Sequence, residues 1–194
     1  MRFLKNLNIA DWFSLYRVIS LPLLLTLIVL EERIWFSWFL GISYATDAID
    51  GYLARSLKIT SARGSQLDSL GDQLTLTVAL VGLLIFEGSF IRDNLVLILM
   101  AFVPYLAQMV LAFRKYGKAT AFHTYLAKIS AITQGVFILW LLFFGPVYWL
   151  FYLMIALSVL ETMEEITLIF MYDHWVSNVR GIYWAMCDER RTTY

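Results

Sequence analysis

Six long apolar stretches follow one another along the chain, and they constrain its fold more than any other feature. A helix that spans a membrane needs about 20 consecutive, mostly apolar residues. The stretches cover about residues 14–30, 34–55, 67–87, 94–114, 124–144 and 147–172, and short polar breaks separate them. Hydrophobic residues make up 60% of the chain and charged residues 15%, against about 25% charged residues in soluble domains. We therefore expect an all-α integral membrane protein with six transmembrane helices.

The two ends of the chain lie outside these stretches. Residues 1–13 form an amphipathic entry, which predicts a short interfacial helix, and residues 173–194 form a mixed cytoplasmic tail. No repeat or low-complexity segment is present, so we expect a single membrane domain over residues 1–194. Cys187 is the single cysteine, which excludes a disulfide within the chain. The formal net charge of zero gives no indication of a nucleic-acid partner.

The charges in the polar breaks predict how the helices are oriented. The second and fourth breaks carry basic residues without an acid, namely Arg55, Lys58, Arg63, Arg114, Lys115 and Lys118. The first and third breaks contain acids as well, namely Glu31, Glu32, Glu87 and Asp93. Because lysine and arginine concentrate in cytoplasmic loops, we expect a multi-pass protein with both termini in the cytoplasm. We expect the membrane to be that of a bacterial or archaeal cell.

Four aspartates gather where the second and third predicted spans meet at the cytoplasmic face. Asp47 and Asp50 are three residues apart, and Asp68 and Asp72 are four apart, so each pair shares one face of a helix. Acids within membrane segments are costly and mark functional sites, and clustered carboxylates need protons or cations to neutralise them. Hard carboxylate oxygens select magnesium, manganese or calcium rather than zinc. Four carboxylates suffice to bridge two such ions, an arrangement suited to phosphate transfer.

The residues between the aspartates suit a phosphate-bearing ligand. Gly51 and Ala54 leave space on the helix surface, and the guanidinium of Arg55 offers a fork of donors that matches phosphate. Ser61 adds a hydroxyl in the loop, and Gly64 opens the next helix without bulk.

The spacing of these residues resembles the signature of the CDP-alcohol phosphotransferase family, also called the CDP-alcohol phosphatidyltransferase family. The match runs through residues 47–72, "DAIDGYLARSLKITSARGSQLDSLGD", and holds at every defining position. The segment "NIADWFSLYR" is similar to the N-terminal segment of the family, with Asp11, Ser14 and Arg17 at its polar positions. Ala10 stands where the family often has proline.

The resemblance implies an enzyme that passes a phosphatidyl group from CDP-diacylglycerol, or a related CDP-lipid, to a small alcohol and releases CMP. It implies two Mg²⁺ or Mn²⁺ ions held by Asp47, Asp50, Asp68 and Asp72, with Asp72 also acting as the general base. It implies contacts to the CDP-lipid from a set of six residues, namely Asp11, Ser14, Gly51, Ala54, Arg55 and Ser61. The implied partners are the two substrates, membrane lipids and a second copy of the chain in a homodimer.

The acceptor alcohol stays open among serine, glycerol 3-phosphate and inositol phosphate. The stretch "QLDSLGD" is similar to the serine-accepting branch, whereas members that accept glycerol phosphate usually carry proline and lysine where Ser69 and Gln73 stand here. A phosphate on the acceptor needs basic residues, and the candidates are Arg63, Arg114 and Lys128. A cation channel or transporter that uses the acids as an ion site is the alternative function.

Three further acids, Glu161, Glu164 and Glu165, lie within the sixth predicted span. Glu161 and Glu165 share a helix face. Three interpretations stay open: the acids line the catalytic cavity, contact a dimer partner, or pair with a bundle residue such as Lys128.

The six-span topology predicts which loop positions a membrane-impermeant thiol reagent can reach. Single cysteines at Lys58 and Lys118 should be labelled from the cytoplasmic side, and one at Glu32 from the opposite side, in vesicles of known orientation. Labelling of the Lys58 and Glu32 positions from the same side would contradict the topology.

Overall fold

The protein is described by a computed structural model that covers residues 20–57, 62–177 and 179–192. Within these ranges, the side chains of residues 47, 48, 50–57, 62–73 and 188–192 lie outside the description. The described ranges contain helices and no strand, apart from one isolated parallel bridge between Ala121 and Ser177. The predicted all-α class is therefore confirmed. The predicted interfacial helix at residues 1–13 lies outside the described residues.

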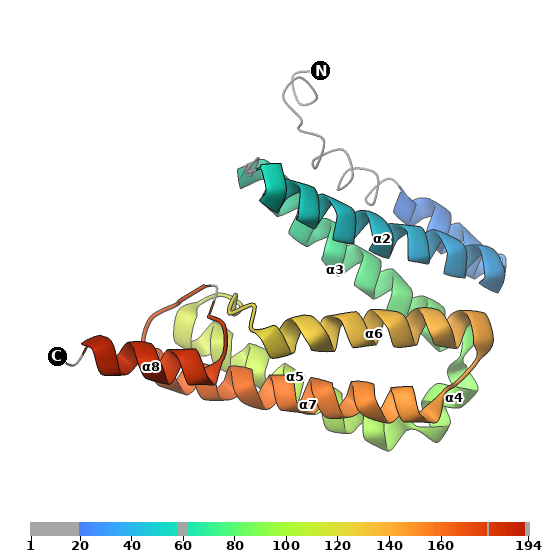
Figure 1. The fold of residues 1–194 in the computed structure, drawn as a ribbon. Coiled ribbons are helices and arrows are strands. Elements are labelled where there is room, and N and C mark those ends of the chain that lie inside the picture. The colour runs from blue at the N-terminus through green and yellow to red at the C-terminus, as the bar shows by residue number, and fades with distance from the viewer. Residues whose placement is uncertain (1–19, 58–61, 178, 193–194) are drawn as a thin grey trace. The chain divides into compact units, whose positions relative to one another are not determined.

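The helices coincide with the predicted apolar stretches (Figure 1). Ser20–Val29 is helical within the first stretch. The later helices are α2 (Arg33–Leu57), α3 (Ala62–Phe86), α4 (Gly88–Asp93), α5 (Leu95–Tyr116), α6 (Tyr125–Phe144), α7 (Tyr148–Met171) and α8 (Ile182–Thr192). The largest difference in a boundary is at α3, which begins at Ala62 rather than at residue 67. The short helices α4 and α8 lie in segments that we predicted as a polar break and a tail.

Two helices in the described part of the chain, α5 and α6, are long and apolar enough to cross a membrane. Ser20–Val29 and Leu74–Phe86 are shorter apolar helical segments. Large apolar side chains on α5 are exposed, with Val96 at 72% and Met100 at 58%. An apolar surface of this kind indicates contact with lipid rather than with water. The full number of six spans stays a prediction.

The described residues form two compact units. The first contains the residues up to Ser89 together with Leu139–Gly145, and the second contains Phe90–Ile138 and the residues from Pro146 onward. The helix α6 contributes to both units. The prediction of a single domain over residues 1–194 stays a prediction.

In the first unit, α2 and α3 pack directly against each other. The ring of Phe36 on α2 is fully buried and lies so close to Gly82 on α3 that a Cβ at this glycine would collide with the ring. The Phe36 ring also contacts Phe86, with 5.4 Å between the ring centroids. Glycine at position 82 therefore brings the two helices into close contact.

In the second unit, α5 packs along α7. Three buried aromatic rings, Phe90, Phe137 and Phe151, contact one another with centroid distances of 5.1–6.0 Å. A polar bond joins α6 to α7, because Gln134 Nε2 donates to Ser158 Oγ over 2.9 Å. Such bonds link helices in apolar surroundings, where the polar groups find few other partners.

Candidate functional site

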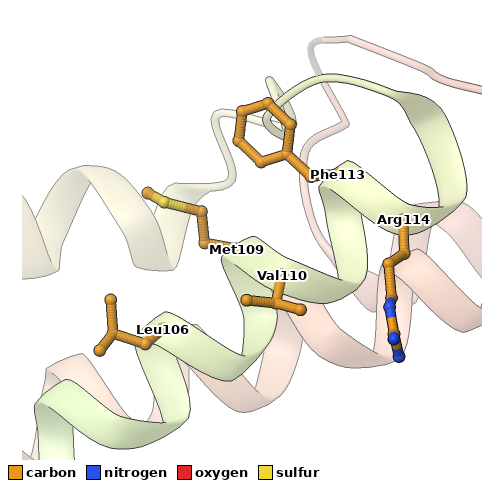
Figure 2. A pocket seen from close by; sticks show the side chains of 5 residues that line it. All are labelled: Leu106, Met109, Val110, Phe113 and Arg114. Carbon is orange, nitrogen blue, oxygen red and sulfur yellow. The ribbon is translucent and has the colours of Figure 1, made fainter.

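The structure separates two of the three basic residues that we predicted as acceptor contacts. Arg114 lines a hollow of about 440 Å³ on α5, together with the apolar residues Leu106, Met109, Val110 and Phe113. Figure 2 shows these four apolar side chains and Arg114 along the same helix. Lys128 lines a different hollow. The side chain of the third candidate, Arg63, lies outside the described residues.

The second hollow, which we call the cationic pocket, is lined by His123, Tyr125, Lys128 and Arg180 and has a volume of about 300 Å³. Lys128 and Arg180 are exposed, and Lys128 Nζ lies 5.4 Å from the centroid of the Tyr125 ring. A hollow with an ammonium, a guanidinium and an imidazole offers donors to an anion on several sides. The arrangement therefore suits a phosphate group.

Arg180 is a residue that our sequence analysis missed. We assigned residues 173–194 to a cytoplasmic tail, but backbone contacts bring the segment after α7 against the loop between α5 and α6. Tyr125 N donates to Arg180 O over 3.2 Å, and Ala121 pairs with Ser177 in the isolated bridge. No signal in the sequence pairs residues so far apart along the chain.

A tryptophan holds the same two segments together. Trp175 Nε1 donates to Ala119 O over 3.0 Å, and Lys118 Nζ lies 3.6 Å from the centroid of the Trp175 ring. A cation over an indole face contributes about 0.5–2 kcal/mol, depending on its exposure to water. At the start of this loop, Gly117 ends α5 with a φ of 71°, which glycine adopts without strain.

The acids in the sixth predicted span face hydrogen-bond donors. Glu165 Oε2 accepts hydrogen bonds from Gln108 Nε2 at 2.6 Å and from Thr120 Oγ1 at 2.7 Å. Gln108 Nε2 also donates to Thr120 Oγ1 over 3.0 Å. In the described part of the chain, the predicted ion pair between these acids and Lys128 is not formed, and this interpretation was wrong for Glu165.

The four signature aspartates lie on two helices that contact each other. Asp47 and Asp50 are in α2, and Asp68 and Asp72 are in α3, although their side chains lie outside the described residues. The same holds for the side chains of three predicted lipid contacts, Gly51, Ala54 and Arg55. Three further predicted contacts, Asp11, Ser14 and Ser61, are outside the described residues altogether.

The chemistry of this donor set fits divalent cations, because carboxylate oxygens are the ligands that Mg²⁺ and Mn²⁺ prefer. Elsewhere, the described residues contain no group of three or more His, Cys, Asp or Glu placed to hold a metal ion. The aspartates on α2 and α3 therefore stay the candidates for a metal site.

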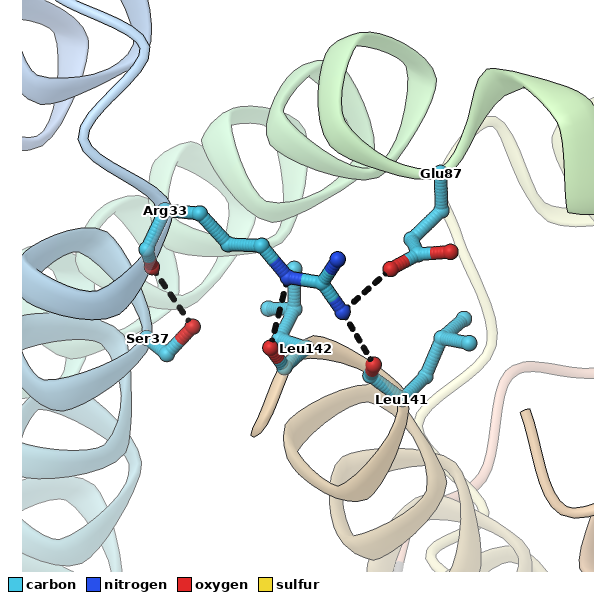
Figure 3. A network of polar contacts seen from close by, with 5 residues as sticks. All are labelled: Arg33, Ser37, Glu87, Leu141 and Leu142. Atoms are coloured by element: carbon cyan, nitrogen blue, oxygen red, sulfur yellow. Dashed lines mark hydrogen bonds and ion pairs between the residues drawn. The ribbon is translucent and has the colours of Figure 1, made fainter. Parts of the chain in front are cut away.

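At the other ends of the aspartate helices, a polar clasp joins α2 to α3 (Figure 3). The guanidinium of Arg33, the first residue of α2, forms an ion pair with the buried carboxylate of Glu87, which directly follows α3. Arg33 also donates to the carbonyl oxygens of Leu142 at 2.8 Å and Leu141 at 2.9 Å, near the end of α6. The clasp restrains how α2 and α3 slide along each other.

Comparison with known proteins assigns the chain to a family. A family model described as CDP-alcohol phosphatidyltransferase matches residues 7–163, which is more than half of the chain. The chain belongs to the CDP-alcohol phosphatidyltransferase family. The resemblance that we inferred from residues 47–72 is thereby confirmed, and the match extends over the helices from α2 to most of α7.

Several bacterial relatives share part of this chain. A CDP-diacylglycerol--glycerol-3-phosphate 3-phosphatidyltransferase of Yersinia pestis (strain Pestoides F) is 37% identical over 80 residues, which are 39% of this chain and 43% of that protein. The protein of the same name from Sodalis glossinidius (strain morsitans) is 34% identical over 83 residues, 39% of this chain and 43% of that protein. That of Cereibacter sphaeroides is 30% identical over 87 residues, 43% of this chain and 39% of that protein. The matched region thus spans less than half the length of each relative.

Breaking the clasp should destabilise this CDP-alcohol phosphatidyltransferase family member. Arg33→Met or Glu87→Gln leaves the partner buried without its countercharge, so we expect each to lower the free energy of unfolding by about 2–3 kcal/mol. The measurement is unfolding in detergent micelles. The exposed neighbour Glu32, changed to Gln, is the control and should shift stability by less than about 0.5 kcal/mol. If the Arg33→Met/Glu87→Leu double variant loses the full sum of the two single effects, the pair does not interact as described.

Proposed function

We propose that the protein is a membrane enzyme that transfers a phosphatidyl group from CDP-diacylglycerol, or a related CDP-lipid, to a small alcohol and releases CMP. The observation that carries the proposal is the family match over residues 7–163, which includes the whole signature at residues 47–72. The relatives named above are transferases, which favours an enzyme over the alternative of a cation channel or transporter.

In the proposed reaction, the hydroxyl oxygen of the acceptor attacks the phosphorus that carries the diacylglycerol. The bond from this phosphorus to the bridging oxygen of the diphosphate breaks, and CMP leaves with that oxygen. The carboxylate of Asp72 accepts the proton of the hydroxyl, while Arg55 and Gly51 bind and orient the CDP part. Two Mg²⁺ or Mn²⁺ ions, held by the four aspartates, supply positive charge to the diphosphate.

We propose further that the acceptor carries a phosphate group. The cationic pocket supports this proposal, because Lys128 and Arg180 are exposed and have no hydrogen-bond or ion-pair partner for their charged groups within the described residues. Serine would leave these cations without an anionic partner of matching size. Glycerol 3-phosphate is the phosphate-bearing alcohol in the names of the relatives, and we propose it as the acceptor. We also propose a homodimer, following the family resemblance.

Removal of either pocket cation should weaken acceptor binding selectively. We expect Lys128→Gln and Arg180→Gln each to raise the KM for glycerol 3-phosphate about tenfold, because a hydrogen bond between charged groups contributes about 1.5–3 kcal/mol. The KM for the CDP-lipid should not change. Arg114→Gln is the comparison, since Arg114 lines the apolar hollow instead. If Arg114→Gln raises the acceptor KM and the two pocket variants do not, the acceptor assignment is wrong.

Replacement of the proposed base tests the catalytic assignment. Asp72→Asn keeps nearly the same shape but cannot accept the proton, so we expect turnover to fall by at least about two orders of magnitude. Binding of the CDP-lipid should stay measurable, whereas Asp50→Asn should weaken metal and nucleotide binding as well. CMP release by Asp72→Asn at a rate near that of the unmodified protein would exclude Asp72 as the base.

A further inference from the structure

The two segments that carry the cationic pocket are joined to two neighbouring acids of α7. One segment is the loop between α5 and α6, which contains His123 and leads to Lys128. The other is the segment after α7, which contains Arg180 and leads into α8. Adjacent residues of a helix point in directions about 100° apart, so neighbouring side chains can reach two different segments.

Glu165 binds the first segment. Its Oε2 atom accepts the hydroxyl proton of Thr120, three residues before His123, and the amide proton of Gln108 on α5. Gln108 is buried and donates to both Thr120 and Glu165, so the three side chains form a closed triangle. A hydrogen bond to an ionised carboxylate is short and strong, which restrains the loop at this position.

Glu164 binds the second segment. Its Oε1 atom accepts a hydrogen bond of 3.4 Å from the backbone N of Ile182, two residues after Arg180. Ile182 N is at the start of α8, where backbone N–H groups lack partners within the helix and favour a negative charge. The carboxylate of Glu164 therefore suits this position.

We propose that Glu164 and Glu165 are positioning residues, each of which holds one of the two segments that bring Lys128 and Arg180 together in the cationic pocket. This proposal rests on the proposed function of the pocket as the acceptor site. It gives the two acids a role that none of our three sequence interpretations contained. Neither acid takes part in the reaction itself. Both act through the placement of the pocket residues.

The distance between the segments can be tested without any substrate. Ala121 and Ser177 pair in a parallel bridge, in which the two backbones lie about 5 Å apart, within the range that a disulfide spans. Ala121→Cys and Ser177→Cys are combined with Cys187→Ser, so that the new pair holds the protein's two thiols. The rate of disulfide formation in detergent micelles then reports how often the segments meet.

We expect Thr120→Val and Glu165→Ala to slow this cross-linking about tenfold, because each removes a hydrogen bond to or from the carboxylate. Thr120→Ser keeps the hydroxyl and should restore the rate. Thr167→Val is the matched control, because the exposed hydroxyl of Thr167 bonds to the Met163 carbonyl of its own helix. Equal rates in all these variants would overturn the proposal.

Kinetics distinguish positioning of the acceptor from general stabilisation. We expect Thr120→Val to raise the KM for glycerol 3-phosphate about tenfold, with kcat and the KM for the CDP-lipid unchanged, and Thr120→Ser to restore the acceptor KM. An altered cross-linking rate with an unaltered acceptor KM in the active enzyme would overturn the proposal. If the unmodified protein releases no CMP with any acceptor, the proposed function fails, and the cross-linking rates alone decide whether the acids hold the segments.

Discussion

An ionised side chain inside an apolar helix bundle is costly unless a partner compensates its charge, and this cost explains where the charges of the described residues lie. Arg33 and Glu87 form a pair, and Arg33 also binds the free carbonyls near the end of α6. Glu165 receives two donors from Gln108 and Thr120. Each compensated charge also joins segments that are distant in the sequence. The polar contacts therefore determine which parts of an otherwise apolar structure lie together.

Hydropathy predicted the long helices because a membrane-length apolar run has one stable backbone conformation in lipid. The expected stretches 124–144 and 147–172 differ from α6 and α7 by one residue at each boundary that differs. The short helix α8 escaped prediction because its apolar content is low. It is held by packing instead, with Ala185 buried in a cluster that includes Phe122 and Leu168. Packing of this kind depends on residues far apart in the chain, which a local pattern does not reveal.

The candidate site divides in the same way. The aspartate signature is local, since its spacings place Asp47 with Asp50 and Asp68 with Asp72 on single helices, and the family match supports that part. The cationic pocket is not local. Lys128 was identified from its position in an apolar run, whereas Arg180 reaches the pocket through a backbone bond to Tyr125 and a bridge between Ala121 and Ser177. Sequence analysis could not predict these contacts, because backbone groups carry no residue-specific signal.

The central claim is that this chain transfers a phosphatidyl group, and release of CMP measures that claim most directly. Purified protein is incubated with CDP-diacylglycerol and magnesium, and glycerol 3-phosphate, serine or inositol phosphate is added in separate reactions. The account predicts CMP release with glycerol 3-phosphate, none with serine, and none with any acceptor after the metal is chelated. The absence of CMP with every acceptor, together with cation flux into sealed vesicles that lack CDP-lipid, would contradict it.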